Sequence, residues 1–397
     1  MQDWITLAIM RKEVLLLFLF LMAAARPGRT QQADTTILLI ADLTVQLEAT
    51  EAMNAMYNFD FEEARKQYNW LRQLHPGHPL AYFLLGLNEW WKIMPDTEVK
   101  TYDRSFLYYM DSAIVLAERM LDIPERRIEG AFFLAASYGF KGRLYSERGE
   151  WGKAASAGRK ALKYLEISKG YSYLSPELLF GDALYNYFSV WIPENYPILK
   201  PILAFFPDGD KDLGLKQLRE VAYNAFYTRI EAQVFLMQIL ADDNYNYREA
   251  LMIAEYLYKH YPNNAYFHRY YARYLYSLHN YARMEPVAKQ ILARIDSGMT
   301  GYEAISGRYA AFFLGQAYQY RSQYDSAIYY YERAVDFARQ KDALKTGYCV
   351  YSLLNLGRIA IKEEQKKEAR GYLRQVKKLT KRKHPAHKQA VKLLKEM

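Results

Sequence analysis

Three aspartates have the spacing that comes nearest to a metal site in this chain. Asp208, Asp210 and Asp212 stand at positions 1, 3 and 5 of a calcium-binding loop. Such a loop needs Gly at position 6 and a bidentate Glu at position 12, where this chain has Leu213 and Arg219. We therefore interpret the three acids as turn-forming residues whose negative charge favours the N-terminus of the helix that follows.

The other candidate ligands are two histidine pairs and a single cysteine. His75 and His78 are three residues apart, as are His384 and His387. A metal site needs further ligands nearby and proline interrupts both segments, so we interpret all four as loop histidines. Cys349 is the only cysteine, so an intramolecular disulfide is excluded, and its apolar neighbours predict a buried thiol. The sequence has no Gly-rich phosphate loop and no nucleophile elbow. It therefore predicts no metal, no cofactor and no enzymatic activity.

A recurring set of small and aromatic residues indicates the elements that carry these side chains. Counted from a small residue, the set recurs at offsets 0, 3, 9, 12, 16 and 19. The clearest copies are Gly315, Tyr318, Tyr324, Ala327, Tyr331 and Ala334; Gly142, Tyr145, Trp151, Ala154, Gly158 and Ala161; and Gly357, Ala360, Lys366, Ala369, Leu373 and Val376. The small residues let two antiparallel helices approach closely, and the aromatic rings fill the space beside each contact. One such pair cannot bury its apolar face alone, so pairs must stack.

The repeat predicts an all-α fold, a right-handed superhelical solenoid of antiparallel helix pairs with about eight units, some of them irregular. Residues 32–378 are expected to form one continuous array and residues 379–397 a basic capping helix. The fourth unit is the irregular one. It has a helix from Pro176 to Trp191, then a proline-rich stretch at 192–212, then a helix from Leu213 to Ala225. A small-ligand binder or an enzyme that uses this unit is one alternative, and it requires a deep pocket near Trp191 to Asp212.

The pattern resembles the tetratricopeptide repeat family over nearly all of residues 32–378. The fourth unit adds a local resemblance to the tetratricopeptide-39 and inclusion-body-clearance family, in the segments 180–185, 189–193, 205–210 and 214–215. The first resemblance implies a scaffold that holds a partner in its concave groove. The second implies architecture only, because this chain departs from that family in having a leader for export.

First-helix residues of the last three units predict where a partner would bind. Spacings of three, four and seven residues place side chains on one helix face, and Arg and Tyr often dominate binding interfaces. We expect these residues to line a groove that binds a protein or peptide: Tyr266, Arg269, Tyr270, Arg273, Tyr276, Tyr309, Gln316, Tyr320, Asn355, Arg358 and Lys362. Replacing Arg269 and Arg273 by Ala is expected to weaken partner binding without lowering thermal stability.

Positive charge is concentrated at the C-terminal end. The formal net charge of the chain is +9, but residues 366–397 hold twelve Lys or Arg against two acidic residues, so the remaining 365 residues sum to −1. Two interpretations stay open: a solvated face of a capping helix, or contact with an anionic lipid, an anionic polymer or an acidic partner. The residues for such a contact are Lys377, Lys378, Lys381, Arg382 and Lys383. The alternative function is thus a structural component of the cell envelope docked through this end. Nucleic acid is not an expected partner.

The N-terminal residues predict export. Arg11 and Lys12 precede an apolar run from Val14 to Ala25, which is typical of a secretory signal peptide and short for a membrane span. We assign residues 1–31 to this signal peptide, with Met10 as an alternative start. The expected location is the periplasm or the cell envelope, and an uncleaved N-terminal membrane anchor is the alternative.

Overall fold

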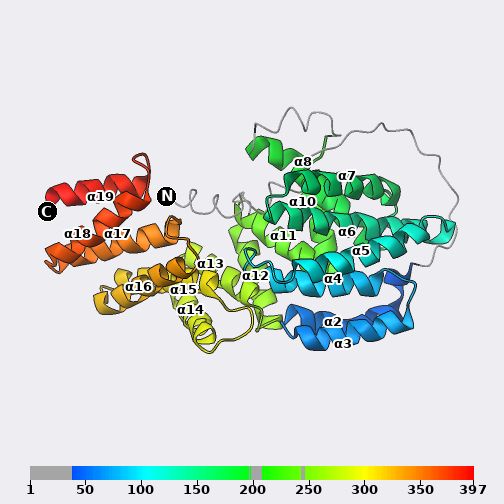
Figure 1. Cartoon of the computed structure of the whole chain (residues 1–397), viewed down its shortest axis with the longest axis horizontal. Coiled ribbons are helices and arrows are strands. Elements are labelled where there is room, and N and C mark those ends of the chain that lie inside the picture. Colours follow the sequence, from blue (N-terminus) through cyan, green and yellow to red (C-terminus); the bar gives the residue numbers. More distant parts are fainter. Residues whose placement is uncertain (1–37, 196, 198–207, 243–245) are drawn as a thin grey trace. The chain divides into compact units, whose positions relative to one another are not determined.

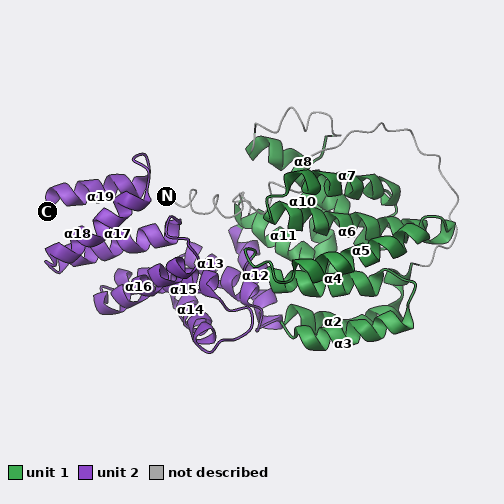
Figure 2. Ribbon diagram, in the orientation of Figure 1, with its two compact units in different colours: residues 1–93, 97–246 green, residues 94–96, 247–397 purple. Residues whose placement is uncertain are grey.

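The computed structural model describes residues 38–195, 197, 208–242 and 246–397, and every regular element in these ranges is a helix (Figure 1). The predicted all-α solenoid of helix pairs is confirmed. The chain divides into two compact units (Figure 2): unit 1 comprises residues 1–93 and 97–246, and unit 2 comprises residues 94–96 and 247–397. Within the described ranges, no helix combines the length and apolar character that crossing a membrane requires. The predicted signal peptide lies outside the described residues.

Unit 1 contains the first helix pairs. Its elements are η1 (Leu39–Ala41), α2 (Leu43–Tyr57), α3 (Phe61–Leu74), α4 (Leu80–Ile93), α5 (Asp103–Met120), η2 (Pro124–Arg126), α6 (Arg127–Glu147), α7 (Trp151–Ser168), η3 (Pro176–Leu178), α8 (Leu179–Asn195), α10 (Lys211–Asn224) and α11 (Arg229–Asp242). Consecutive helices pack as pairs, most extensively α6 with α7 and α8 with α10.

Unit 2 continues the same arrangement. Its elements are α12 (Tyr247–His260), α13 (Ala265–Ser277), α14 (Tyr281–Asp296), α15 (Ala304–Tyr320), α16 (Tyr324–Gln340), α17 (Gly347–Lys362), α18 (Lys366–Leu379) and α19 (Pro385–Glu396). The consecutive helices α11 and α12 therefore belong to different units, α11 to unit 1 and α12 to unit 2. The predicted buried thiol is confirmed, because Cys349 is fully buried in the core that α16–α19 share.

Small residues permit the closest contacts between paired helices, as the repeat predicts. A Cβ atom placed on Gly315 of α15 would lie 2.6 Å from the Tyr331 ring of α16. A Cβ atom on Gly357 of α17 would lie 2.8 Å from Leu373 Cδ2 of α18. Neither position has room for a side chain, so glycine sets the distance between the two helices of each pair.

A residue with positive φ connects the two helices in five of the described pairs. These residues are Phe59, Gly149, His279, Ser322 and Glu364, with φ values between 56° and 70°. Each stands two residues before the second helix begins, at offset 7 of the repeat. Only one of the five is glycine, the residue that adopts this conformation without steric cost. The turn at offset 7 is a recurring feature that the sequence pattern did not reveal.

The irregular fourth unit is a helix pair formed by α8 and α10. The Asp210 carboxylate accepts the backbone N–H groups of Asp212 (2.9 Å) and Leu213 (3.0 Å), so Asp210 is the N-cap of α10. Asp210 thus caps the helix and Asp212 lies in its first turn, as the sequence predicted for these two aspartates. A Cβ atom on Gly214 would lie 2.6 Å from the backbone nitrogen of Tyr187, so α10 lies directly against the α8 backbone.

Candidate functional site

Most of the predicted groove residues are packed inside unit 2. The buried ones are Tyr266, Arg269, Tyr270, Arg273, Tyr309 and Asn355. Tyr276 and Gln316 are half-buried, and Tyr320, Arg358 and Lys362 are the more accessible ones. The structure thus brings the α13 and α15 side chains together, but largely as core, and it leaves only three of the eleven readily accessible to a partner.

Arg269 is bound by groups of its own unit. Its Nη1 donates to the Pro95 carbonyl at 3.0 Å and to Ser306 Oγ at 3.3 Å, and it lies 3.6 Å from Glu303 Oε1. The guanidinium also lies between two tyrosine rings, 5.3 and 5.9 Å from their centroids. Burial raises the pKa of Glu303, and the charge of Arg269 opposes that rise. Arg269 therefore fixes the segment 94–96, which occupies the hydrogen-bonding position predicted for a partner.

Arg273 differs from Arg269 in its partners. Its guanidinium is 5.7 Å from the centre of the Tyr270 ring, and the side chain is 7% exposed. It makes no hydrogen bond or ion pair with any residue that the structure describes. Arginine stays charged in proteins, so the tyrosine ring provides the main stabilisation of this cation. The N–H groups of Arg273 can still donate hydrogen bonds, but the burial of the side chain means that only a small group can reach them.

The accessible cations of unit 2 gather at its C-terminal helices. We call the twelve Lys and Arg of residues 366–397 the basic end. Nearly all of them are exposed, including the predicted Lys377, Lys378, Lys381, Arg382 and Lys383. Among described residues only Lys392 has an ion-pair partner, Glu396 at 3.7 Å. Apart from Lys392, the cations of the basic end therefore have no carboxylate partner among the described residues.

The sequence of α18 and α19 explains why these cations point outward. Ala369, Leu373 and Val376 of α18 are buried and follow one another at intervals of four and three residues. Ala386 and Ala390 of α19 are buried four residues apart. This narrow apolar stripe packs into the shared core together with other partly buried apolar side chains of the two helices, whereas their Lys and Arg side chains face solvent.

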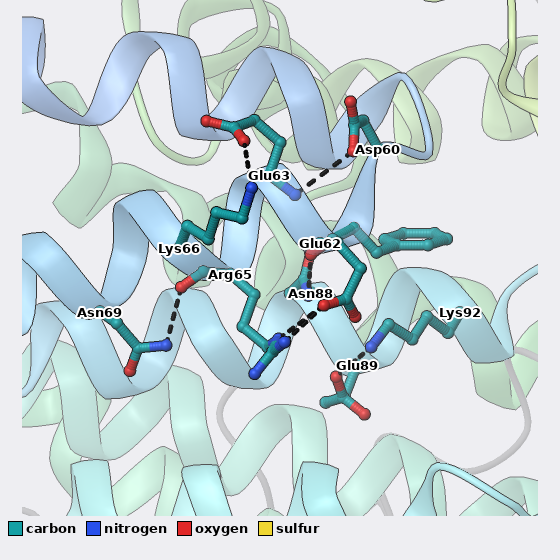
Figure 3. Close-up of polar contacts among 10 residues, drawn as sticks. Asp60, Glu62, Glu63, Arg65, Lys66, Asn69, Asn88, Glu89 and Lys92 are labelled. Atoms are coloured by element: carbon teal, nitrogen blue, oxygen red, sulfur yellow. Dashed lines mark hydrogen bonds and ion pairs between the residues drawn. The ribbon is translucent and has the colours of Figure 1, made fainter.

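A cluster of charged side chains on α3 and α4 is a structural feature, not a site (Figure 3). Glu62 accepts a hydrogen bond from Arg65 Nε at 3.2 Å, which lowers the pKa of that carboxyl group. Glu63 pairs with Lys66 at 3.2 Å, and Asp60 caps α3. These are exposed pairs three residues apart, and such pairs contribute little to stability. In the described residues no group of His, Cys, Asp and Glu could hold a metal ion.

The histidine pairs also have structural roles. His78 Nε2 lies 3.3 Å from Glu129 Oε2, and His384 Nδ1 accepts the N–H of Ala386 at the start of α19. The other member of each pair lies within 3.8 Å of a carboxylate or a backbone carbonyl. His75, His78 and His384 lie outside the helices, as expected, whereas His387 lies within α19, so the interpretation as a loop histidine is wrong for that residue.

Unit 1 contains a cavity that sequence reasoning missed. Its volume is about 140 Å³, and it lies among α4, α6, α7, α8 and α11. Arg143, Tyr227 and Glu231 are buried lining residues, and the fourth unit contributes the first half of α8. The described residues of the expected stretch, Trp191 to Asp212, do not line it. The sequence contains no signal for it, because α6 has two glycines beyond Gly142 and only one of them borders the cavity: Gly130 packs against α5, whereas Gly139 faces the open space.

Comparisons with known proteins give no family for this chain. No family model matches it, and no curated protein matches it. Among solved structures, a human IFIT1 dimer with PPP-AAAA has a TM-score of 0.45 and 13% sequence identity, covering 89% of this chain and 72% of that one. The P58(IPK) TPR domain has a TM-score of 0.25 and 12% identity, covering 89% of this chain and 99% of that one. These values are too low to transfer a partner or an activity.

Proposed function

We propose that this chain is a non-enzymatic helical-repeat scaffold that binds an acidic segment of a protein partner at the C-terminal helices of unit 2. One observation carries the proposal: the cations of the basic end are nearly all exposed, and all but Lys392 lack an ion pair among the described residues. A patch of one sign attracts and steers a partner of the opposite sign.

Two predicted groove residues extend this positive surface onto α17. Arg358 donates to Gln389 of α19 at 2.7 Å and to Asn355 at 3.1 Å. Lys362 hydrogen-bonds the Tyr324 hydroxyl. Both cations are held by neutral groups, so their charge adds to that of α18 and α19. The α17–α19 end therefore combines part of the predicted groove with the basic end.

The composition of this surface favours an acidic protein segment over a lipid bilayer. Side chains that insert into a membrane surface are large and apolar. In the described part of unit 2, the exposed large hydrophobic residues are Met252, Leu278, Tyr320 and Tyr329, and none of them lies on α17–α19. Anionic lipid remains the second candidate, supported by charge alone. The proposal also places the protein outside the cytoplasm, on the basis of the signal-like residues 1–31.

Charge-neutralising variants test the proposal. In one variant Lys377, Lys378, Lys381, Arg382 and Lys383 become Gln. The matched control removes the same charge from five exposed cations of unit 1 by Lys100→Gln, Arg126→Gln, Arg127→Gln, Lys163→Gln and Lys216→Gln. Binding of a labelled peptide rich in Glu and Asp, and of vesicles with and without phosphatidylserine, is measured at low and high salt.

We expect the basic-end variant to bind the acidic peptide at least about tenfold more weakly than the control, and salt to weaken the wild type strongly. Used as baits in an envelope extract, wild type and control should recover a protein that the basic-end variant does not. Equal peptide affinity of the two variants would contradict the proposal. Tighter binding to anionic vesicles than to the peptide would favour the lipid candidate instead.

A further inference from the structure

We propose that unit 1 binds a small, neutral, mainly apolar molecule, about the size of one aromatic ring and carrying a hydroxyl group, in the cavity among α4, α6, α7, α8 and α11. This site is separate from the basic end and goes beyond the proposed scaffold function.

The cavity exists because the helices around it present very small side chains. Seven of its 23 lining residues are Gly or Ala, most of them on α6 and α7. A Cβ atom placed on Gly139 would meet no heavy atom within 4 Å, whereas Gly142 lies in ordinary contact with α7. Protein interiors are normally close-packed, and an unfilled cavity lowers stability. A ligand that fills the space would recover the missing contacts.

The volume limits the size of the ligand. The cavity measures about 140 Å³. An apolar cavity of about 150 Å³ in another protein holds benzene. Half-exposed Leu162, Leu165 and Leu184 also line it, so the way in is apolar. The body of the ligand is therefore one ring or a branched aliphatic group of the same size.

Two buried polar side chains line the cavity. Glu231 is 2% exposed; its Oε1 accepts a hydrogen bond from Trp91 Nε1 at 2.8 Å, and the Tyr57 side chain also interacts with the carboxylate. The Tyr227 hydroxyl, on a side chain that is 3% exposed, has no hydrogen-bond partner in the described structure. Leaving such a buried group unsatisfied is unfavourable. A ligand hydroxyl can accept a hydrogen bond from Tyr227, so it complements this group.

The charges that line the cavity favour a neutral ligand. Burial raises the pKa of Glu231, and the positive charge of Arg143 opposes this rise. The Arg143 guanidinium lies over the rings of Trp90 (4.7 Å) and Phe235 (5.4 Å). A carboxylate and a guanidinium are thus already present together, and a charged ligand would add an unbalanced charge in a buried place.

The test uses 4-fluorophenol and fluorobenzene, which differ only in the hydroxyl group, in fluorine NMR titrations of the full chain. Gly139→Leu fills the cavity. Gly152→Leu is its matched control, because a Cβ atom placed on that helical glycine also meets no heavy atom within 4 Å, yet Gly152 does not line the cavity. Tyr227→Phe removes a hydroxyl that has no partner in the described structure, so it leaves the fold intact. Ala161→Met, at another lining position, provides a second filling variant, and far-UV circular dichroism checks the folding of each.

We expect wild type and Gly152→Leu to bind 4-fluorophenol about tenfold more tightly than fluorobenzene, the preference that one hydrogen bond gives. Tyr227→Phe should lose most of this preference, and the filling variants should bind neither compound. The proposal is wrong if neither compound binds, if folded filling variants bind as wild type does, or if the two compounds bind equally.

Discussion

Arg269 binds the backbone of its own unit, and this determines what its removal would do. Arg269→Ala would leave the Pro95 carbonyl without its donor and the largely buried Glu303 without its cation. We expect unit 2 to lose about 3 kcal/mol of unfolding free energy, the cost of breaking a buried ion pair. Denaturant unfolding followed by circular dichroism measures it, with indole fluorescence identifying the transition of unit 1, since unit 2 has no tryptophan. Arg358→Ala, at an exposed residue of the same unit, should cost well under 1 kcal/mol.

This result changes the use of the two arginines as probes of partner binding. The sequence led to the expectation that replacing Arg269 and Arg273 together would leave thermal stability unchanged; we now expect a loss of stability, because both side chains are buried. Wild-type stability for Arg269→Ala would mean that the Pro95 contact contributes nothing. Arg273→Ala is the matched comparison for stability, because Arg273 is also buried but no described residue depends on it for a hydrogen bond.

His268 gives unit 2 a defined dependence on pH. It is fully buried beside the Tyr302 hydroxyl, 2.9 Å away. Burial, with a smaller effect of the Arg294 charge, lowers the pKa of His268 to about 3. Below pH 6.5 His268 binds a proton in the unfolded chain but stays neutral in the folded chain. This residue therefore lowers stability as pH falls from 6.5 toward 3, by up to about 1.4 kcal/mol per pH unit, and has no effect above that window.

The measurement is the difference in unfolding free energy between pH 7 and pH 5. His268→Gln should lose less stability over this interval than wild type by about 2 kcal/mol. His279→Gln, at an exposed histidine of the same helix pair, should behave as wild type. The same pH dependence in all three proteins would show that His268 is protonated in the folded state.

Residue type and spacing predicted which side chains lie together, but not which are accessible. The periodicity of α13 correctly places Arg269 and Arg273 in one tyrosine-rich region. It carries no information about the segment that covers this region, because Pro95 is 174 residues away in the sequence. The more accessible Arg358 and Lys362 were predicted by the same rule, and only the surrounding packing separates the two cases.

At the scale of elements, the turn at offset 7 places non-glycine residues in a left-handed conformation. Glu364, between α17 and α18, has φ of 59°. The steric strain of a side chain in this conformation costs about 1–2 kcal/mol. Glycine removes this strain but makes the unfolded chain more flexible, which offsets part of the gain. We expect Glu364→Gly to stabilise unit 2 by about 0.5–1 kcal/mol. Thermal unfolding measures the change.

The neighbouring residue supplies the control. Glu363 has φ of −89°, so glycine there gains nothing and loses backbone entropy. Glu363→Gly should therefore lower the melting temperature while Glu364→Gly raises it. If both substitutions lower it, the left-handed turn is not strained.

Helix pairs could be predicted because the small residues that permit close contact are visible in a single repeat. Gly315 against Tyr331 is such a pair, and the repeat places both. The cavity of unit 1 could not be predicted in this way, because it depends on how five helices together fail to fill one space. A glycine such as Gly139 has the same appearance in the sequence whether a neighbour fills the adjoining space or leaves it empty.

At the scale of the whole molecule, the boundary of the positively charged segment differs from the boundary between the two compact units. The concentration of positive charge after residue 366 is visible in the composition, and the structure exposes nearly all of it. The division into two units, with α11 in one and α12 in the other, is not visible, since the repeat continues across this point. Local periodicity determines helices and pairs, whereas compact units depend on contacts between residues distant in the sequence.

The division into units also places all tryptophans of the molecule in one unit. All six tryptophans precede residue 192, and unit 2 has none, although it is rich in tyrosine. Two of the six, Trp90 and Trp91, contact Arg143 and Glu231 beside the cavity. The tryptophans of the described residues all lie in unit 1, so their fluorescence reports on that unit and is sensitive to what enters its cavity, whereas tyrosine occurs in both units. The unfolding of unit 1 can thus be followed by indole fluorescence while circular dichroism records the whole chain.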